Sequence, residues 1–336
     1  MHYNVFNGDA DGIIALLQLT LAQIHIQTQT EQVPYQLITG VKRDISLLQQ
    51  VDVSKASSVT VLDISLEKNN QALTALLAAQ VPVFYVDHHR TGEVPQSPLL
   101  TSLLDTDANT CTSLLINEHL GGAYVHWAIA AAYGDNMLAS ADVLAQQVGL
   151  SQEQREQLNE LGTYINYNGY GQALADLHFH PAELYQVLLA YPDPFVLIGQ
   201  KNSIFSQLKL AYLADMKKAQ AAKVLTDNAV VKTIILEDGA WSRRVSGVFG
   251  NDLANQAPNK AHIVVTLNPV QADDKATNEA SYTVSLRAPL NNKQGAGDIC
   301  AQYPSGGGRA AAAGVNALPL NALDQFIAHV ARYYQG

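Results

Sequence analysis

In the first third of the chain, short apolar runs alternate with longer stretches of helical periodicity. The apolar runs predict strands at Tyr3–Phe6, Tyr35–Thr39, Val59–Leu62 and Val83–Val86. Helices are expected between them, one from about Ile13 and another near Lys68–Ala79. Strands that alternate with helices in this way are typical of a parallel sheet with helices on both faces. We therefore expect an α/β fold at the start of the chain.

The middle of the chain has mostly helical periodicity. Helices are expected over Leu115–Leu120, Val125–Tyr133, Ala141–Val148 and Gln152–Leu161. The stretch Tyr164–Gly171 is rich in Tyr, Asn and Gly, which favours a loop. A further helix over Phe205–Leu225 alternates Leu, Ala and Lys, a pattern that suits an exposed connection between two domains.

The last third returns to mixed periodicity. Strands are predicted at Lys232–Leu236, Ala261–Leu267 and Tyr282–Leu286, with a Gly-rich turn at Gly306–Gly308 and a closing helix near Leu323–Tyr333. We expect two α/β domains, residues 1–200 and residues 231–336, joined by a linker helix within residues 201–230. The smaller domain is expected to face the larger one across a cleft.

Composition narrows the class of partner. The 336 residues are 48% hydrophobic, and the formal net charge is −10. A negatively charged protein repels long polyanions, and the chain has no Lys/Arg run, so tight binding to long duplex DNA is not expected. A small nucleotide or short single-stranded oligonucleotide suits it better, because bound cations can invert the local field.

The chain also lacks the signs of secretion or membrane insertion. It has two cysteines, no signal-peptide pattern at its start and no long apolar stretch. These features predict a cytoplasmic protein that does not bind membranes. They leave the oligomeric state open, a homodimer included.

Acidic and imidazole side chains follow three of the predicted strands. Asp9 and Asp11 follow the first, Asp63 the third, and Asp87-His88-His89 the fourth. One Asp after a strand is usually a turn residue, but the carboxyl ends of parallel strands meet at one edge of the sheet. Carboxylates gathered there repel one another unless cations neutralise them. Oxygen and imidazole ligands suit Mn²⁺ or Mg²⁺, with Zn²⁺ or Co²⁺ as alternatives, and a metal pair can clamp a phosphoryl group and activate water.

Four motifs, in order along the chain, resemble those of the DHH phosphoesterase superfamily. They are Asn7-Gly8-Asp9-Ala10-Asp11-Gly12, Val61-Leu62-Asp63, Asp87-His88-His89 and Tyr133-Gly134-Asp135-Asn136. The segment Gly306–Gly314 resembles the glycine motif of the DHHA1 subgroup. That subgroup includes RecJ-type exonucleases, nanoRNases that also remove phosphate from pAp, and cyclic-dinucleotide phosphodiesterases. The resemblance covers nearly the whole chain.

The resemblance implies a metal centre of two Mn²⁺ ions, with Mg²⁺ or Co²⁺ as alternatives. Asp9 and Asp63 would hold one ion. The ligands of the other would be Asp11, Asp63, His88 and Asp135, with Asp63 bridging the pair. These five side chains, together with His89, would form the catalytic site.

The resemblance also implies roles outside the metal ligands. Asp87 would orient His88 without binding the metal itself, and Asn7 would support the first motif in the same way. His89 would contact the scissile phosphate. The substrate-binding residues implied in this way are His89, Arg287, Gly306, Gly307, Gly308 and Arg309. Independently, a glycine run before a helix would point backbone N–H groups and a helix dipole at an anion.

Three positions differ from the family pattern. Val5 stands where many members carry a His, and Asn7 stands where RecJ-type members carry an Asp. These differences predict a weaker first metal, or Asn7 as a neutral oxygen ligand. Arg309 replaces the usual His after the triple glycine and could hold phosphate through two parallel hydrogen bonds.

The sequence therefore favours a metal-dependent phosphoesterase acting on short oligonucleotides, linear dinucleotides such as pGpG, or pAp. One alternative is a RecJ-like exonuclease for single-stranded DNA. The other is a nucleotide-binding or sensor protein with weak turnover, favoured by Val5 and Arg309.

Overall fold

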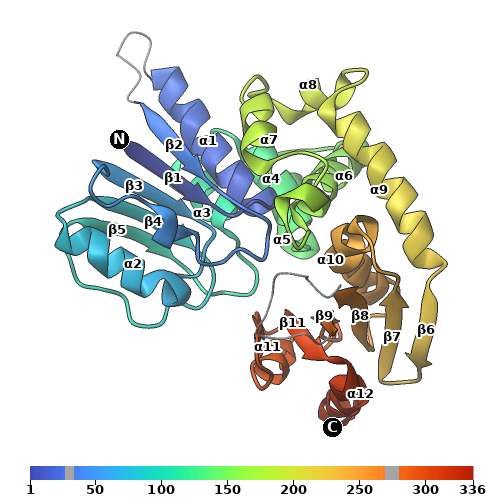
Figure 1. Cartoon of the computed structure of the whole chain (residues 1–336). Helices are drawn as coiled ribbons and strands as arrows, with labels where there is room; N and C mark the ends of the chain where they lie inside the picture. The colour runs from blue at the N-terminus through green and yellow to red at the C-terminus, as the bar shows by residue number, and fades with distance from the viewer. Residues whose placement is uncertain (27–33, 269–279, 336) are drawn as a thin grey trace. The chain divides into compact units, whose positions relative to one another are not determined.

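The computed structural model describes residues 1–26, 34–268 and 280–335. The chain forms two compact units, Met1–Leu210 and Ala211–Gly336 (Figure 1). Both units combine helices with a sheet, so the predicted α/β class is confirmed. Within the described parts of the chain, none of the helices has the length and apolar character that crossing a membrane requires.

The sheet of the first unit has five parallel strands in the order β2-β1-β3-β4-β5. The strands are β1 (His2–Phe6), β2 (Tyr35–Ile38), β3 (Ser58–Leu62), β4 (Val83–Asp87) and β5 (Leu100–Leu104). The first four lie where the apolar runs predict them, whereas β5 follows a weaker pattern. Because β1, β3 and β4 are neighbours, their carboxyl ends lie next to one another, and this adjacency positions the site.

Alternate side chains of these strands face opposite layers. Val5, Val61 and Tyr85 point to one face, where they pack with Leu66 and Leu73 of α2 (Leu66–Ala78) in an apolar cluster. Figure 1 shows α2 on that face and α1 on the other. Val5 is therefore a core residue, fully buried among aliphatic side chains.

Helices make up the rest of the first unit. Their bounds are α1 (Ala10–Ile26), α3 (Thr112–His119), α4 (Val125–Gly134), α5 (Leu138–Gln147), α6 (Gln152–Gly169), α7 (Pro181–Leu188) and α8 (Pro194–Gly199), with 3-10 turns at Leu47–Gln50 and Leu174–Asp176. Helix α9 (Ile204–Gln220) runs across the boundary between the units. The predicted loop at Tyr164–Gly171 is wrong for most of its length, because residues 164–169 form the buried end of α6.

The second unit has a six-stranded mixed sheet in the order β10-β11-β9-β8-β7-β6. Its elements are β6 (Lys223–Asp227), β7 (Val231–Leu236), α10 (Ala240–Gln256), β8 (Ala261–Asn268), β9 (Ser281–Arg287), α11 (Ala296–Cys300), β10 (Gly306–Gly308), β11 (Ala312–Pro319), a 3-10 turn at Leu320–Ala322, and α12 (Leu323–Tyr334). The helix expected over Phe205–Leu225 ends at Gln220. The residues that follow enter β6, which pairs with β7.

Candidate metal centre

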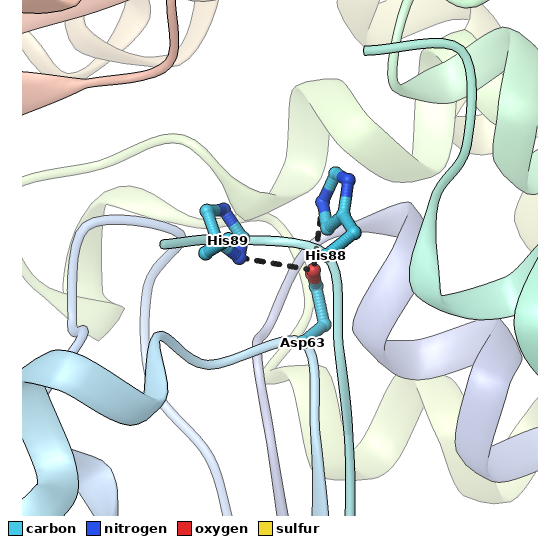
Figure 2. Close-up of side chains that lie close together, drawn as sticks. All are labelled: Asp63, His88 and His89. Carbon is cyan, nitrogen blue, oxygen red and sulfur yellow. Dashed lines mark ion pairs between the residues drawn. The ribbon is translucent and has the colours of Figure 1, made fainter. Parts of the chain in front are cut away.

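The carboxyl ends of β3 and β4 bring one carboxylate and two imidazoles together. Asp63 Oδ1 lies 3.3 Å from His88 Nε2 and 3.8 Å from His89 Nδ1. Figure 2 shows the Asp63 carboxylate reaching both rings. Asp63 and His88 are buried, and these three side chains have the spacing of a metal-ligand group.

His88 belongs to a second group of potential ligands. Its Nε2 lies 3.8 Å from Asp11 Oδ2 and 3.8 Å from Asp135 Oδ2. Asp11 lies in the first turn of α1, and Asp135 follows the last residue of α4. Three segments far apart in the sequence thus place ligand atoms within 4.8 Å of one another.

The contacts of His88 leave its Nε2 available to bind a metal ion. Its Nδ1 lies 3.0 Å from the carbonyl oxygen of Thr110. A carbonyl can only accept, so Nδ1–H donates, and Nε2, which faces the carboxylates, is the nitrogen that can bind a metal. Metal-bound imidazoles are commonly oriented by this kind of contact on the other ring nitrogen.

Helix α3 holds Asp11 in place. The backbone N–H groups of Thr112 and Ser113 donate to its two oxygens at 2.8 and 2.7 Å. These N–H groups lack partners within their own helix, so the carboxylate satisfies them and interacts with the positive end of the helix dipole. The Thr112 hydroxyl also donates to Asp63 Oδ1 at 3.2 Å. Thr110, Thr112 and Ser113 thus support the site, although the sequence indicates only that a helix starts near it.

The metal-free cluster is electrostatically unfavourable. Burial raises the pKa of Asp63 well above its ordinary value, and the neighbouring carboxylates raise it further. Asp63 also has a φ of 60°, a left-handed conformation uncommon outside Gly, Asn and Asp. A divalent cation among Asp11, Asp63, His88 and Asp135 would remove the repulsion. Three carboxylates and one imidazole suit Mn²⁺ or Mg²⁺.

Asp9 has a different partner. Its Oδ2 forms an ion pair with Lys42 Nζ, and its Oδ1 accepts from Gly12 N at 3.0 Å. Burial alone would raise the pKa of Asp9, but the Lys42 ammonium outweighs it and the pKa falls below its ordinary value. Among the described residues, Asp9 belongs to neither group of potential metal ligands. The sequence gives no sign of this role for Lys42, because nothing in Val41-Lys42-Arg43 distinguishes it from an ordinary loop lysine.

Asp87 contacts His89, whereas the predicted partner is His88. Asp87 Oδ1 accepts from His89 Nδ1 at 2.7 Å, while His88 is oriented by Thr110. The reason is the alternation of side chains along an extended segment, which puts residues two apart on the same side. Asp87 is fully buried, so it fixes the ring of the more exposed His89.

Asn7 supports the first motif through the backbone. Its Oδ1 accepts from Asp9 N at 3.3 Å, and its Nδ2 donates to the carbonyl of Lys42 at 3.3 Å. It therefore connects the turn after β1 to the loop after β2.

In the second unit, Arg287 is buried and forms hydrogen bonds with neighbouring residues of the same unit. Its guanidinium donates to Asn251, Ser285 and the carbonyls of Leu286 and Gly247. Its predicted role in substrate binding stays a prediction.

The triple glycine has a structural role in the second unit. Gly306–Gly308 is strand β10, paired antiparallel with β11, so the helix expected after the glycines is replaced by a strand. A Cβ at Gly306 would overlap the carbonyl oxygen of Cys300, and one at Gly308 would lie 2.5 Å from Ala313 Cα. Close backbone packing thus explains two of the three glycines. Gly307 has open space around it.

We expect Mn²⁺ to stabilise the chain through His88. At about one hundred times its Kd, a ligand of the folded state adds about 2.7 kcal/mol to the free energy of unfolding. His88→Ala should lose most of the resulting rise in Tm, because Nε2 is shared by both ligand groups. His25→Ala, at an exposed position near the end of α1, is the matched control. Thermal melts with and without Mn²⁺ check this, and an undiminished rise in His88→Ala would exclude His88 as a ligand.

Comparison with known proteins places this geometry in context. No protein-family model matches the chain, and no curated protein matches its sequence. Among solved structures, exonuclease RecJ bound to manganese matches with a TM-score of 0.54 and 17% identity, covering 99% of this chain and 90% of that one. A pGpG-specific phosphodiesterase from Vibrio cholerae matches with a TM-score of 0.52 and 12% identity, covering 100% and 99%.

An exopolyphosphatase-related protein from Bacteroides fragilis is also similar, with a TM-score of 0.51 and 13% identity over 99% of this chain and 92% of that one. All three neighbours are members of the DHH superfamily. At these identities the likeness shows the fold alone, and that fold is the one that the motifs predict.

Proposed function

We propose that this chain, with its DHH fold, is a metal-dependent hydrolase of phosphate esters in small nucleotides. The observation that carries the proposal is that the carboxylates of Asp11, Asp63 and Asp135 all lie within 3.8 Å of the buried His88 Nε2. Carboxylates held this close in a protein interior repel one another unless protons or cations neutralise them, and a divalent cation would neutralise the group as a whole. A divalent ion there would neutralise the developing charge of a phosphoryl group and lower the pKa of a water molecule.

The chain's own residues would position the reacting groups. Asp11 is fixed by the N-terminus of α3, and His88 by Thr110, so neither ligand has to reorganise. His89 is more exposed than His88, and Asp87 holds it through Nδ1. Its Nε2 is thus the ring nitrogen available to contact an oxygen of the scissile phosphate.

The substrate class is proposed from charge and from the structural neighbours. A chain with a net charge of −10 suits a small anion held by a metal better than a long polyanion. One neighbour is described as a pGpG-specific phosphodiesterase and another as an exonuclease. We propose short oligoribonucleotides, linear dinucleotides or pAp as substrates, with Mn²⁺ as the metal.

A screen of defined substrates tests the proposal. With Mn²⁺ present, we expect hydrolysis of pAp, pGpG and oligomers of a few nucleotides, with a rate that falls as the oligomer lengthens. Chelation of the metal should abolish turnover. Processive digestion of long single-stranded DNA would instead support a RecJ-like exonuclease. Tight nucleotide binding without hydrolysis would support a sensor and contradict the proposal.

A further inference from the structure

The ammonium group of Lys42 lies among side-chain oxygen atoms. The residue follows β2 in a loop whose backbone is fixed, because Lys42 N donates to the carbonyl of Gly169 at 2.8 Å. Its ammonium forms an ion pair with Asp9 and lies 3.4 Å from Asp135 Oδ1 and 3.0 Å from Asn166 Oδ1. An ammonium has three N–H donors, and three oxygens surround this one. The side chain is only 19% exposed.

One of the three oxygens around Lys42 belongs to Asp9, a predicted ligand of the second metal ion. The resemblance implies that Asp9 holds that ion together with Asp63, but Asp9 is paired with the ammonium instead. The neighbouring positions offer no anionic replacement, because Val5 is in the apolar core and Asn7 is neutral and bonded to backbone. A second divalent cation would have to displace Lys42 from Asp9.

Asp135 connects the two cation positions. Its Oδ1 faces Lys42 Nζ at 3.4 Å, and its Oδ2 faces His88 Nε2 at 3.8 Å. The carboxylate can therefore bind an ion on the His88 side while it stays paired with the ammonium. In this arrangement Asp135, rather than Asp63, is the bridging group.

We propose that the Lys42 ammonium takes the place of one ion of a two-metal centre, so that the chain binds a single divalent cation among Asp11, Asp63, His88 and Asp135. This inference rests on the metal centre of the proposed function and proposes one ion there in place of the two that the resemblance implies. Lys42 is a permanent cation that neutralises Asp9 and keeps Asp135 oriented. The cation on that side of the site is supplied by the fold and does not depend on the metal concentration.

Metal stoichiometry tests the inference without any assay of turnover. Titration of the wild-type chain with Mn²⁺ should give one ion per chain, and its electron paramagnetic resonance spectrum should be that of isolated Mn²⁺. Lys42→Ala removes the ammonium from among the side-chain oxygens of Asp9, Asp135 and Asn166, so that a metal ion can approach them. This variant should take up a second ion and show the spectrum of an exchange-coupled pair.

The controls separate this inference from the proposed function. Lys55→Ala, which removes an exposed ion pair with Asp52, should still bind one ion. Lys42→Gln, which keeps a polar side chain, provides a second variant if Lys42→Ala does not fold. Two coupled ions in the wild-type chain, or one ion in both Lys42 variants, would overturn the inference and leave metal-dependent hydrolysis intact. One bound ion without any hydrolysis would overturn only the proposed function.

Discussion

Replacing Asp63 by asparagine is expected to lower kcat by roughly a thousandfold. Asp63 Oδ1 lies within 4 Å of a ring nitrogen of both His88 and His89, so the substitution removes a charged ligand from the centre of the cluster. A metal contributes several kcal/mol to a phosphoryl-transfer step, and about 4 kcal/mol corresponds to a thousandfold change in rate. Steady-state kinetics with Mn²⁺ and the best substrate of the screen provide the measurement.

Asparagine is the suitable replacement because of the backbone. At a φ of 60°, Asp63 is in the left-handed region, which Asn tolerates better than Ala. Asp63→Ala should also abolish hydrolysis, but it adds backbone strain. Asp52→Asn, at an exposed position paired with Lys55, is the matched control and should keep full activity. Wild-type activity in Asp63→Asn would refute the role of this carboxylate as a ligand.

Although it loses activity, the same variant should be at least as stable as the wild type when no metal is bound. The pKa of Asp63 is raised in the folded state, chiefly by burial and then by the surrounding carboxylates. Above the pKa that Asp63 has in the unfolded chain, the folded state therefore binds more protons than the unfolded state. The free energy of unfolding then falls as the pH rises, until the folded-state pKa of Asp63 is passed. An asparagine side chain cannot ionise, so metal-free Asp63→Asn should melt at or above the wild-type Tm at neutral pH.

The acidic edge of the sheet can be predicted from the sequence, because strand periodicity locates the strand ends and the carboxyl ends of parallel strands lie at one edge. Once β1, β3 and β4 are recognised as parallel neighbours, Asp11, Asp63 and His88 must converge. Lys42 could not be found in this way, since a lone Lys in a loop after a strand is usually solvated. Its role depends on the path of that loop past α6, which brings it to Asn166.

Two local patterns gave the wrong element for identifiable reasons. The segment Tyr164–Gly169 contains residues typical of loops, yet it stays helical because it is buried in the first unit. The glycines at Gly306–Gly308 predict a turn before a helix. They form an edge strand because two of them lie too close to neighbouring backbone for any side chain. In both cases tertiary packing outweighs local preference.

Replacing Gly162 by alanine is expected to lower the free energy of unfolding by about 3 kcal/mol, near the upper end for overpacking a core. Gly162 lies in α6 where that helix meets α4, and a Cβ there would overlap the carbonyl oxygen of Ala130. The obstacle is backbone, so no rotamer change can relieve it and the helices must separate. Gly199→Ala, at the exposed end of α8 with open space around it, is the matched control and should be neutral or slightly stabilising.

The same substitution should weaken metal binding at a distance. Helix α4 ends at Gly134, whose own Cβ position lies 2.7 Å from the carbonyl oxygen of Gly162, and Asp135 is the next residue. A displacement of α4 from α6 therefore moves Asp135 relative to His88 and Lys42. Denaturant unfolding and Mn²⁺ titration of the same variant measure the two effects. A loss of stability with unchanged Mn²⁺ affinity would show that Asp135 is not held by this helix contact, because a ligand fixed by α4 cannot keep its place when α4 shifts.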